Sequence, residues 1–234
     1  MAPCNESDFL SKGYCFMARF TGFDEVYSAL YVDFDNIYTR FLELDPEAAR
    51  IFGTAPYRWV KWLEIHALRM LYGDGVRRRI LKRTCYLNPQ RYQEFRYHFS
   101  RSAFQVVDCP PLTSRGKTST DIHLVMDCMD DLSHSTNFDE FIILSGDSDF
   151  TPLLIRLQEH ARRTLVLSVG YSSPAYTAAA SWRIREDWFI QQALKEEREE
   201  RPTLPDAGAD AGLKRFCGMD DDEDEDTGLP KRPE

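Results

Sequence analysis

Short apolar runs alternate with segments of helical periodicity along most of the chain, and this alternation is the feature that most limits what the chain can fold into. The predicted strands, which share short apolar cores, are residues 30–33, 80–87, 104–108, 141–144 and 163–169. The predicted helices between and after them are residues 57–71, 89–99, 120–132 and 151–160 and a short helix that starts at Ser173. This order predicts an α/β fold with a mostly parallel central sheet flanked by helices on both faces.

One local pattern leads to a further expectation. The helix that Ser119 or Thr120 can cap carries Ile122, Val125, Met126 and Met129 at helical spacing, and we expect this apolar stripe to face the core.

The composition is that of a folded protein without export or membrane signals. Hydrophobic residues make up 43% and aromatic residues 13% of the 234 residues, which is enough for one core. No apolar run approaches the roughly 20 residues of a membrane span, and the polar N-terminus does not resemble a secretory signal, so a cytoplasmic protein is expected. The 6 cysteines show neither zinc-site nor disulfide-framework spacing and are expected to be reduced thiols.

Charge is unevenly distributed along the chain. Residues 195–234 hold 14 acidic and 7 basic residues, so most of the net charge of −9 belongs to this segment, which we expect to be a disordered acidic tail. Residues 58–117 hold 13 basic and only 4 acidic residues. A domain with separate acidic and basic zones can bind cations and a polyanion at once. The predicted organisation is an N-terminal extension (1–27), a domain (28–194) and the tail (195–234).

Acidic residues follow the predicted strands at positions that should converge. Asp33 ends the first strand, Asp121 begins the helix after the third, and Asp147 follows the fourth. In an open α/β sheet, ligands bind beyond the carboxyl ends of the strands, so these acids should face one edge. Asp149, Asp127 and Asp35 are lesser candidates. The alternative is that an aspartate at a strand end caps a turn or helix, which is the expectation for Asp35 and Asp131.

Converging carboxylates predict a divalent cation. Carboxylates a few ångströms apart repel one another unless a cation compensates them. An all-oxygen set without cysteine or histidine suits Mg²⁺ or Mn²⁺, whose bound waters can serve as nucleophiles. The chemistry that follows is metal-assisted hydrolysis of phosphodiester bonds.

The acidic motifs resemble those of the NYN domain, a branch of the PIN-like nucleases that includes the LabA-like proteins. The motifs are Asp33-Phe34-Asp35-Asn36, Lys117-Thr118-Ser119-Thr120-Asp121 with Asp127, Ser145-Gly146-Asp147-Ser148-Asp149-Phe150 and Ser172-Ser173-Pro174-Ala175-Tyr176. The resemblance spans residues 28–190, and relative to that family the stretch 45–56 looks like an insertion before the first helix. It implies a Rossmann-like PIN/NYN sheet and an Mg²⁺ or Mn²⁺ site that acts on RNA, single-stranded or structured. It gives metal-site roles to Asp33, Asp121, Asp147 and Asp149, a supporting role to Asn36 and a weaker one to Asp127.

Basic and aromatic residues near these motifs are candidates for contact with RNA. Phosphate-binding candidates are Arg77, Arg78, Arg79, Lys82, Arg83, Arg115 and Lys117, and Tyr86, Tyr92 or Tyr97 could stack on bases. The alternative is a solvated charged surface with aromatic residues in the core.

Three functions fit these observations. The leading one is a metal-dependent ribonuclease in which Asp33, Asp121 and Asp147 hold the cation and Lys117 steadies the phosphate. The second is an RNA-binding or adaptor module, whose acidic tail recruits a protein partner or shields the groove. The third is a phosphatase of the haloacid-dehalogenase type, because Asp33 and Asp35 lie two residues apart and Gly146 precedes Asp147. RNA identity, endo- or exonucleolytic cleavage and homo-oligomerisation stay open.

Overall fold

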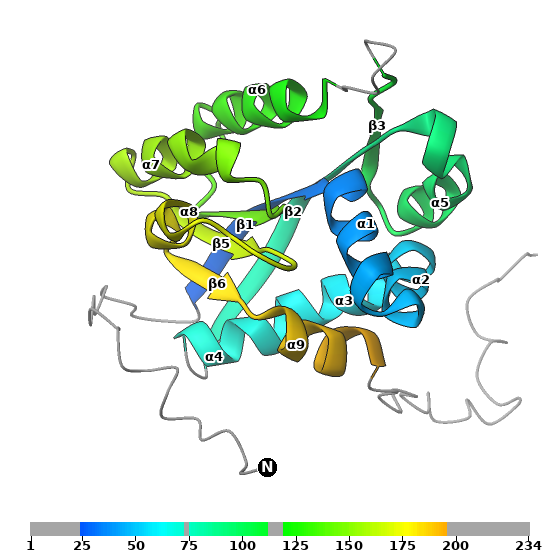
Figure 1. Cartoon of the computed structure of the whole chain (residues 1–234). Helices are drawn as coiled ribbons and strands as arrows, with labels where there is room; N and C mark the ends of the chain where they lie inside the picture. The colour runs from blue at the N-terminus through cyan, green and yellow to red at the C-terminus, as the bar shows by residue number, and fades with distance from the viewer. Residues whose placement is uncertain (1–23, 73–74, 112–118, 196–234) are drawn as a thin grey trace, which may run out of the picture. The chain divides into compact units, whose positions relative to one another are not determined.

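A six-stranded parallel sheet forms the centre of the structure, a computed structural model that describes residues 24–72, 75–111 and 119–195 (Figure 1). Its strands, in the spatial order β3–β2–β1–β4–β5–β6, all pair in parallel. They are β1 (Asp24–Asp33), β2 (Val76–Leu87), β3 (Gln105–Asp108), β4 (Glu140–Leu144), β5 (Arg163–Leu167) and β6 (Trp182–Ile184). The predicted α/β fold is confirmed.

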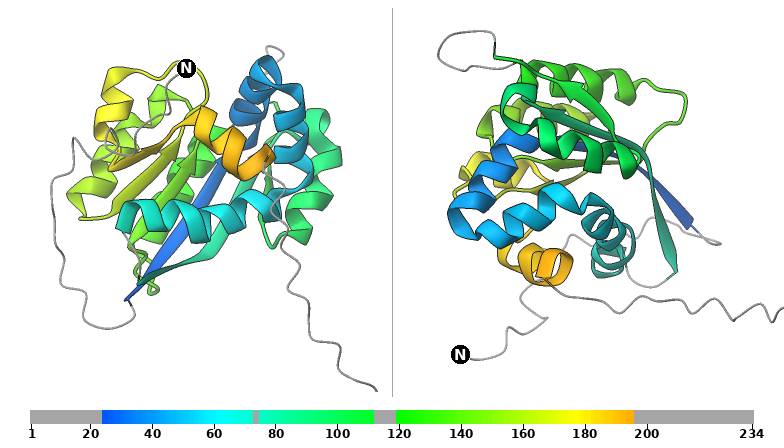
Figure 2. Two further views of the ribbon diagram at one scale, coloured as in Figure 1. Left: turned by 90° about the horizontal axis from the view of Figure 1, so that it is seen from below. Right: turned by 90° about the vertical axis from the view of Figure 1, so that its right-hand side faces the viewer.

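Helices cover both faces of the sheet (Figures 1 and 2). On one face lie α1 (Phe34–Leu44), α2 (Pro46–Thr54), α3 (Pro56–Trp62), a π-helical segment (Leu63–Ala67), α4 (Leu68–Tyr72), α5 (Pro89–Arg101) and α9 (Glu186–Phe189), which continues as a π-helix (Ile190–Lys195). On the other face lie α6 (Thr120–Leu132), α7 (Thr151–Glu159), which a 3₁₀ turn (Ser148–Phe150) precedes, and α8 (Pro174–Ala179). No helix among the described residues is long and apolar enough to cross a membrane.

The strand order places the ligand-binding edge of the sheet between β1 and β4. The chain leaves β1 towards β2 and β3, and then crosses back to β4 on the other side of β1. At such a switch point the loops after the two central strands diverge, and they leave a crevice beyond the carboxyl ends of the strands. Asp33 ends β1, and Ser145 follows β4 at this point.

The central strand β1 is buried on both faces, which explains its continuous apolar sequence. Leu30 and Val32 enter the core under α1, whereas Ala29 and Tyr31 enter the core under α6 and α7. The strand begins at Asp24, earlier than the predicted strand and inside the predicted N-terminal extension. The domain boundaries themselves stay predictions. In the described part of the chain, the free cysteines Cys85, Cys109 and Cys128 are buried, as expected of core thiols.

The expectation that the first helix starts at residue 57 is wrong. The first helix, α1, starts directly after Asp33, and residues 46–54 form a second helix capped by Asp45, whose Oδ1 accepts from Glu47 N and Ala48 N at 3.1 Å. Phe34, Ile37 and Phe41 have the three- and four-residue spacing of a helix, and this pattern was overlooked. In the structure all three side chains are buried on one side of α1. Strand β6 and helix α9 were also not predicted.

Helix α6 buries only part of its predicted apolar stripe. Val125 and Met129 are partly buried against the core, as expected, whereas Ile122 and Met126 are 62% and 58% exposed. Leu124, Cys128 and Asp131, outside the predicted stripe, are buried. The buried Asp131 is not a cap: its Oδ2 accepts a hydrogen bond from Tyr31 Oη at 2.6 Å and lies 2.5 Å from Lys82 Nζ. These partners satisfy the carboxylate, so the helix can bury a polar side chain.

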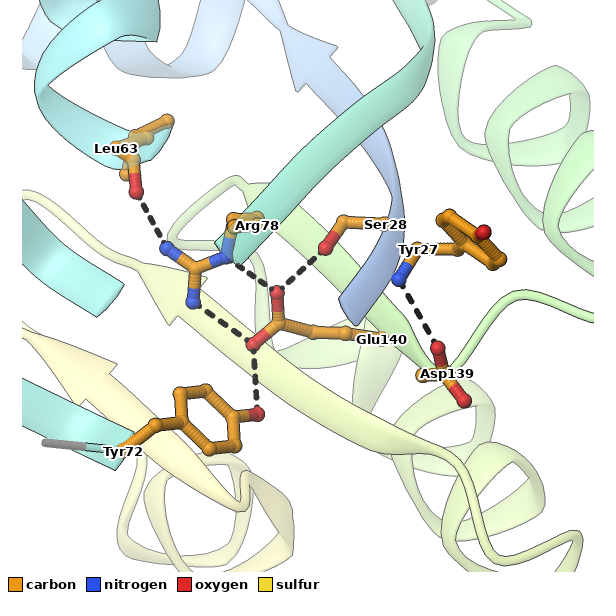
Figure 3. A network of polar contacts seen from close by, with 7 residues as sticks. All are labelled: Tyr27, Ser28, Leu63, Tyr72, Arg78, Asp139 and Glu140. Atoms are coloured by element: carbon orange, nitrogen blue, oxygen red, sulfur yellow. Dashed lines mark hydrogen bonds and ion pairs between the residues drawn. The ribbon is translucent and has the colours of Figure 1, made fainter. Parts of the chain in front are cut away.

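A buried ion pair ties the three central strands together at their amino ends (Figure 3). Arg78 on β2 donates to both carboxylate oxygens of Glu140 on β4, at 2.8 and 2.9 Å, and both side chains are fully buried. Ser28 Oγ on β1 and Tyr72 Oη also donate to Glu140, at 2.8 and 3.2 Å, and Arg78 Nη1 donates to Leu63 O in the π-helical segment at 2.5 Å. Every charge in this network is therefore paired within the protein.

Loss of one partner should leave a buried charge unpaired. We expect Arg78→Met to lower the free energy of unfolding by about 3–5 kcal/mol, because Glu140 would stay buried without its cation. The matched control is Arg40→Met, which removes an exposed pair with Glu43 and should leave the urea midpoint almost unchanged. Urea denaturation followed by circular dichroism measures both, and equal midpoints for the two variants would contradict the structural role of the buried pair.

Candidate functional site

Asp33 lies at the switch point, in a position that burial makes unusual for a carboxylate. It is the last residue of β1 and the N-terminal cap of α1, and only 4% of its surface is exposed. Its Oδ2 accepts a hydrogen bond from Ser145 Oγ at 2.9 Å, and its Oδ1 accepts one from Asn36 N at 3.4 Å. Asp33 therefore caps a helix and is still available as a candidate site residue; the two interpretations of an aspartate at a strand end do not exclude one another.

The segment after β4 is hydrogen bonded to the segment after β1. Asn36 Oδ1 accepts from Gly146 N at 2.9 Å, and Ser145 Oγ, which donates to Asp33, accepts from Asp147 N at 3.2 Å. Gly146 has close neighbours: a Cβ built on it would lie 3.5 Å from both Asn36 Oδ1 and Val169 O. Asn36 thus holds the backbone after β4 against the start of α1.

Asp147 and Asp149 begin the 3₁₀ turn that follows Gly146. Asp147 caps this turn, since its Oδ1 accepts from Asp149 N at 2.9 Å. Asp149 is exposed. Tyr176, from the first turn of α8, donates from its phenol to Ser145 O at 3.0 Å, and burial followed by the carboxylates of Asp33 and Asp147 raises the pKa of Tyr176. Both carboxylates therefore lie within electrostatic reach of one phenol.

The pKa of Asp33 is raised from 3.8 to about 7. Burial is the main cause, and the nearby carboxylates of Asp121 and Asp35 raise it further, against the lowering effect of the hydrogen bonds from Ser145 and Asn36. The influence of Asp121 is informative because Asp121 comes from the first turn of α6, on the other face of the sheet from α1. Acids from β1 and α6 thus meet at one edge.

The donor set can be tested against a divalent cation. Within residues 24–72, 75–111 and 119–195, no group of three or more His, Cys, Asp or Glu side chains is close enough to hold a metal ion. Mg²⁺, however, usually keeps several waters and binds through one or two carboxylates together with substrate phosphates. The pair Asp33 and Asp121, without nitrogen or sulfur donors, fits this mode of binding and does not form a preassembled cage.

The predicted basic residues that the structure describes do not gather at this edge; Arg115 and Lys117 lie outside the described residues. In the register of β2 with β1, Arg77, Arg78 and Arg79 pair with residues 25–27, about 20–26 Å before the end of β1 at ~3.3 Å per residue. The expectation that Arg78 binds phosphate is wrong, because its side chain is buried on Glu140. Lys82 pairs with Asp131 and Arg83 with Glu64, so their charges are balanced internally.

The tyrosines predicted to stack on bases have other roles or positions. Tyr86 is buried, and its phenol donates to Asp127 at 2.5 Å, which gives Asp127 a structural partner. Tyr92 packs edge-on against Phe34 in the aromatic core. Tyr97 is 61% exposed on α5.

Asp35, which was expected to act as a cap, accepts from Asn88 N at 3.0 Å and so joins α1 to the end of β2.

Three residues of this edge were not singled out from the sequence. Ser145 and Tyr176 contact Asp33 and the segment after β4, and both lie inside the motifs that carried the family resemblance. Arg91, in the first turn of α5, lies near enough to Asp35 to lower its pKa, although burial raises that pKa overall. The sequence did not mark Arg91 as a site residue, because a single charged residue after a proline is common in the first turn of a helix.

Asp33 should make the protein less stable as pH rises, whereas an acid held in an ion pair makes a protein more stable as pH rises. Its raised pKa means that the folded state keeps a proton that the unfolded chain loses, so stability is highest below pH 4 in this respect and declines as pH rises to about 7. We expect Asp33→Asn, in EDTA, to remove this decline and to stabilise the protein above pH 7 by roughly 4 kcal/mol at about 1.4 kcal/mol per pKa unit. Urea denaturation across this pH range measures it, with Asp130→Asn as control; parallel profiles for both variants would refute it.

Comparison with known proteins agrees with this architecture. None of the curated protein sequences matches the chain. A solved protein of unknown function from Vibrio parahaemolyticus is similar to it in fold, with 17% sequence identity, a TM-score of 0.52, and coverage of 72% of this chain and 98% of that one. The sequence model of the NYN domain matches residues 27–187, which contain every acid of the candidate site and the whole sheet except the first three residues of β1. The chain therefore belongs to the NYN domain family, within the PIN-like nuclease superfamily.

Proposed function

We propose that the protein is a metal-dependent ribonuclease that hydrolyses RNA phosphodiester bonds at the carboxyl edge of the sheet. The observation that carries the proposal is Asp33, a carboxylate buried at the switch point with its pKa raised by burial and by Asp121. A bound cation would remove the cost of ionising it, which makes the position suited to a metal ligand. Membership of the NYN family favours a nuclease over the phosphatase alternative.

Asp33 and Asp121 would hold Mg²⁺ or Mn²⁺, with Asp147 and Asp149 on the side of the site that faces substrate. When bound, the cation would supply charge stabilisation at the phosphate and an activated water. Ser145 and Asn36 would keep the Asp33 carboxylate and the Gly146 backbone in place, since each hydrogen bonds across the two strand ends. The motif resemblance further suggests the LabA-like branch of the family.

RNA as the substrate is supported by the family and by the cations that adjoin the acids. Arg91 lies on the edge beside Asp35. Arg115 and Lys117 precede Asp121 in the chain and remain proposed phosphate ligands. Both lie outside the described residues. Arg77 and Arg79 are exposed but lie near the amino ends of the strands, so they would contact RNA only well beyond the cleavage site.

One observation favours the alternative of an RNA-binding module with little or no catalysis. The described acids do not form a three-ligand cluster, as a preassembled metal centre would. In this alternative the acidic residues 195–234 would recruit a protein partner. Calorimetric titration with Mn²⁺ separates the two functions, because only the nuclease requires heat of binding that Asp33→Asn and Asp121→Asn abolish.

The nuclease proposal predicts cleavage that depends on the aspartates. We expect the full chain to cut labelled single-stranded RNA in Mn²⁺ and to stop in EDTA. Asp121→Asn and Asp147→Asn should each lower the rate by at least on the order of a hundredfold, because each removes a negative oxygen from the site without changing side-chain size. Rates of product formation on denaturing gels measure this.

Asp130→Asn provides the matched control. Asp130 is an exposed aspartate on the same helix as Asp121, in its last turns. Its substitution removes the same charge at a distance from the edge and should leave the rate unchanged. Intact RNA with the wild-type chain, or equal cutting by Asp147→Asn and Asp130→Asn, would refute the proposal.

A further inference from the structure

Tyr171 is the most exposed of the large apolar side chains that the structure describes. Its exposed fraction is 87%, whereas most aromatic residues of the domain pack into one of the two cores. It lies in the loop between β5 and α8, which follows the carboxyl end of a strand and therefore belongs to the same edge as Asp33 and Asp147. At this exposure the ring is open to contact by a ligand from solvent.

The loop that carries Tyr171 is anchored on both sides of it. On one side, Gly170 adopts a φ of +81°, which favours glycine, and its N–H donates to a carboxylate oxygen of Glu186 at the start of α9. On the other side, Ser172 Oγ donates to Ser168 Oγ at 2.6 Å, and Ser173 Oγ caps α8 by accepting from Tyr176 N at 3.1 Å. The backbone that presents the ring is thus held by its neighbours.

The same loop contacts the acidic segment directly. The carbonyl oxygen of Val169 lies 3.5 Å from the position of a Cβ on Gly146, and Tyr176, in the first turn of α8 after the loop, donates to Ser145 O at 3.0 Å. Tyr171 follows Val169 by two residues, so their Cα atoms are at most about 8 Å apart. The backbone that carries Tyr171 therefore lies near the segment Ser145-Gly146-Asp147.

We propose that Tyr171 is a base-stacking subsite for an unpaired nucleotide beside the phosphate at the acidic edge, an inference that rests on the proposed function and narrows its substrate class to single-stranded RNA. An aromatic face accepts any base, because every base has a π surface, so the subsite gives affinity without sequence preference. A base inside a duplex is stacked on its neighbours and cannot cover the ring. The subsite therefore discriminates by strandedness.

Tyr171 also meets requirements that the predicted stacking residues do not. Tyr86 and Tyr92 are buried, so neither can receive a base. Tyr97 is 61% exposed but lies on α5, not in a loop that follows a strand, and the Arg101 guanidinium lies over its ring at 5.5 Å. Tyr57 is 63% exposed but lies on α3, not in a loop that follows a strand of the sheet. Tyr57 is therefore a comparably exposed tyrosine outside the proposed subsite, and it serves as the control position.

Binding of fluorescein-labelled oligouridine, measured by fluorescence anisotropy with the full chain in EDTA, tests the subsite. We expect Tyr171→Ala to weaken binding on the order of tenfold, from the usual contribution of one stacked base. Tyr171→Phe and Tyr171→Trp keep the aromatic face and should bind as the wild type does. Tyr57→Ala should change nothing, and the affinity for a labelled RNA duplex should be the same for all variants.

Cleavage kinetics in Mn²⁺ add a second measurement. Tyr171→Ala should raise KM for single-stranded RNA while kcat stays near the wild-type value, because stacking beside the scissile bond is retained through the transition state. Unchanged affinity of Tyr171→Ala, equal weakening by Tyr171→Phe, equal loss of duplex binding, or absence of RNA binding by the wild type would each overturn the subsite. Binding that depends on Tyr171 without any cleavage would refute the nuclease proposal and leave the subsite standing.

Discussion

The hydrogen bond between Ser145 and Asp33 joins the ends of the two central strands, and the geometry of the candidate site depends on it. Ser145 Oγ donates to the Asp33 carboxylate and accepts from Asp147 N, so it links the two segments. A second hydrogen bond, from Gly146 N to Asn36 Oδ1, joins the same two segments. The loop that carries Tyr171 and the phenol of Tyr176 then pack against this joint. One small contact thus determines where several side chains from distant parts of the chain lie.

Two buried acids at opposite ends of the sheet show how differently a protein can use a carboxylate. Glu140, at the amino end, receives two hydrogen bonds from the Arg78 guanidinium as well as those of Ser28 and Tyr72. Asp33, at the carboxyl end, receives only neutral donors and faces the carboxylates of Asp121 and Asp35. The first acid is neutralised within the fold and the second is not, which is why the second is suited to an external cation.

Regular patterns were predictable because they reflect local physics. The apolar cores of β2 and β4 and the start of α5 at Pro89 follow from side-chain burial and the fixed φ of proline. Helix α1 was overlooked because its first residues also carry the acidic motif. The stripe of α6 was misjudged because Asp131 and Cys128, which pack inward, look less apolar than Ile122 and Met126.

The sequence by itself determined the α/β class and the family and supplied the candidate aspartates, because strand and helix periodicity and short motifs are local properties. Only the tertiary structure decided which charges are available, since a charge is neutralised by partners that are remote in the chain. Arg78 and Lys82 looked like part of a basic surface until Glu140 and Asp131 were seen beside them. Likewise, the exposure of Tyr171 and the burial of Tyr86 follow from packing, which depends on contacts between elements far apart in sequence.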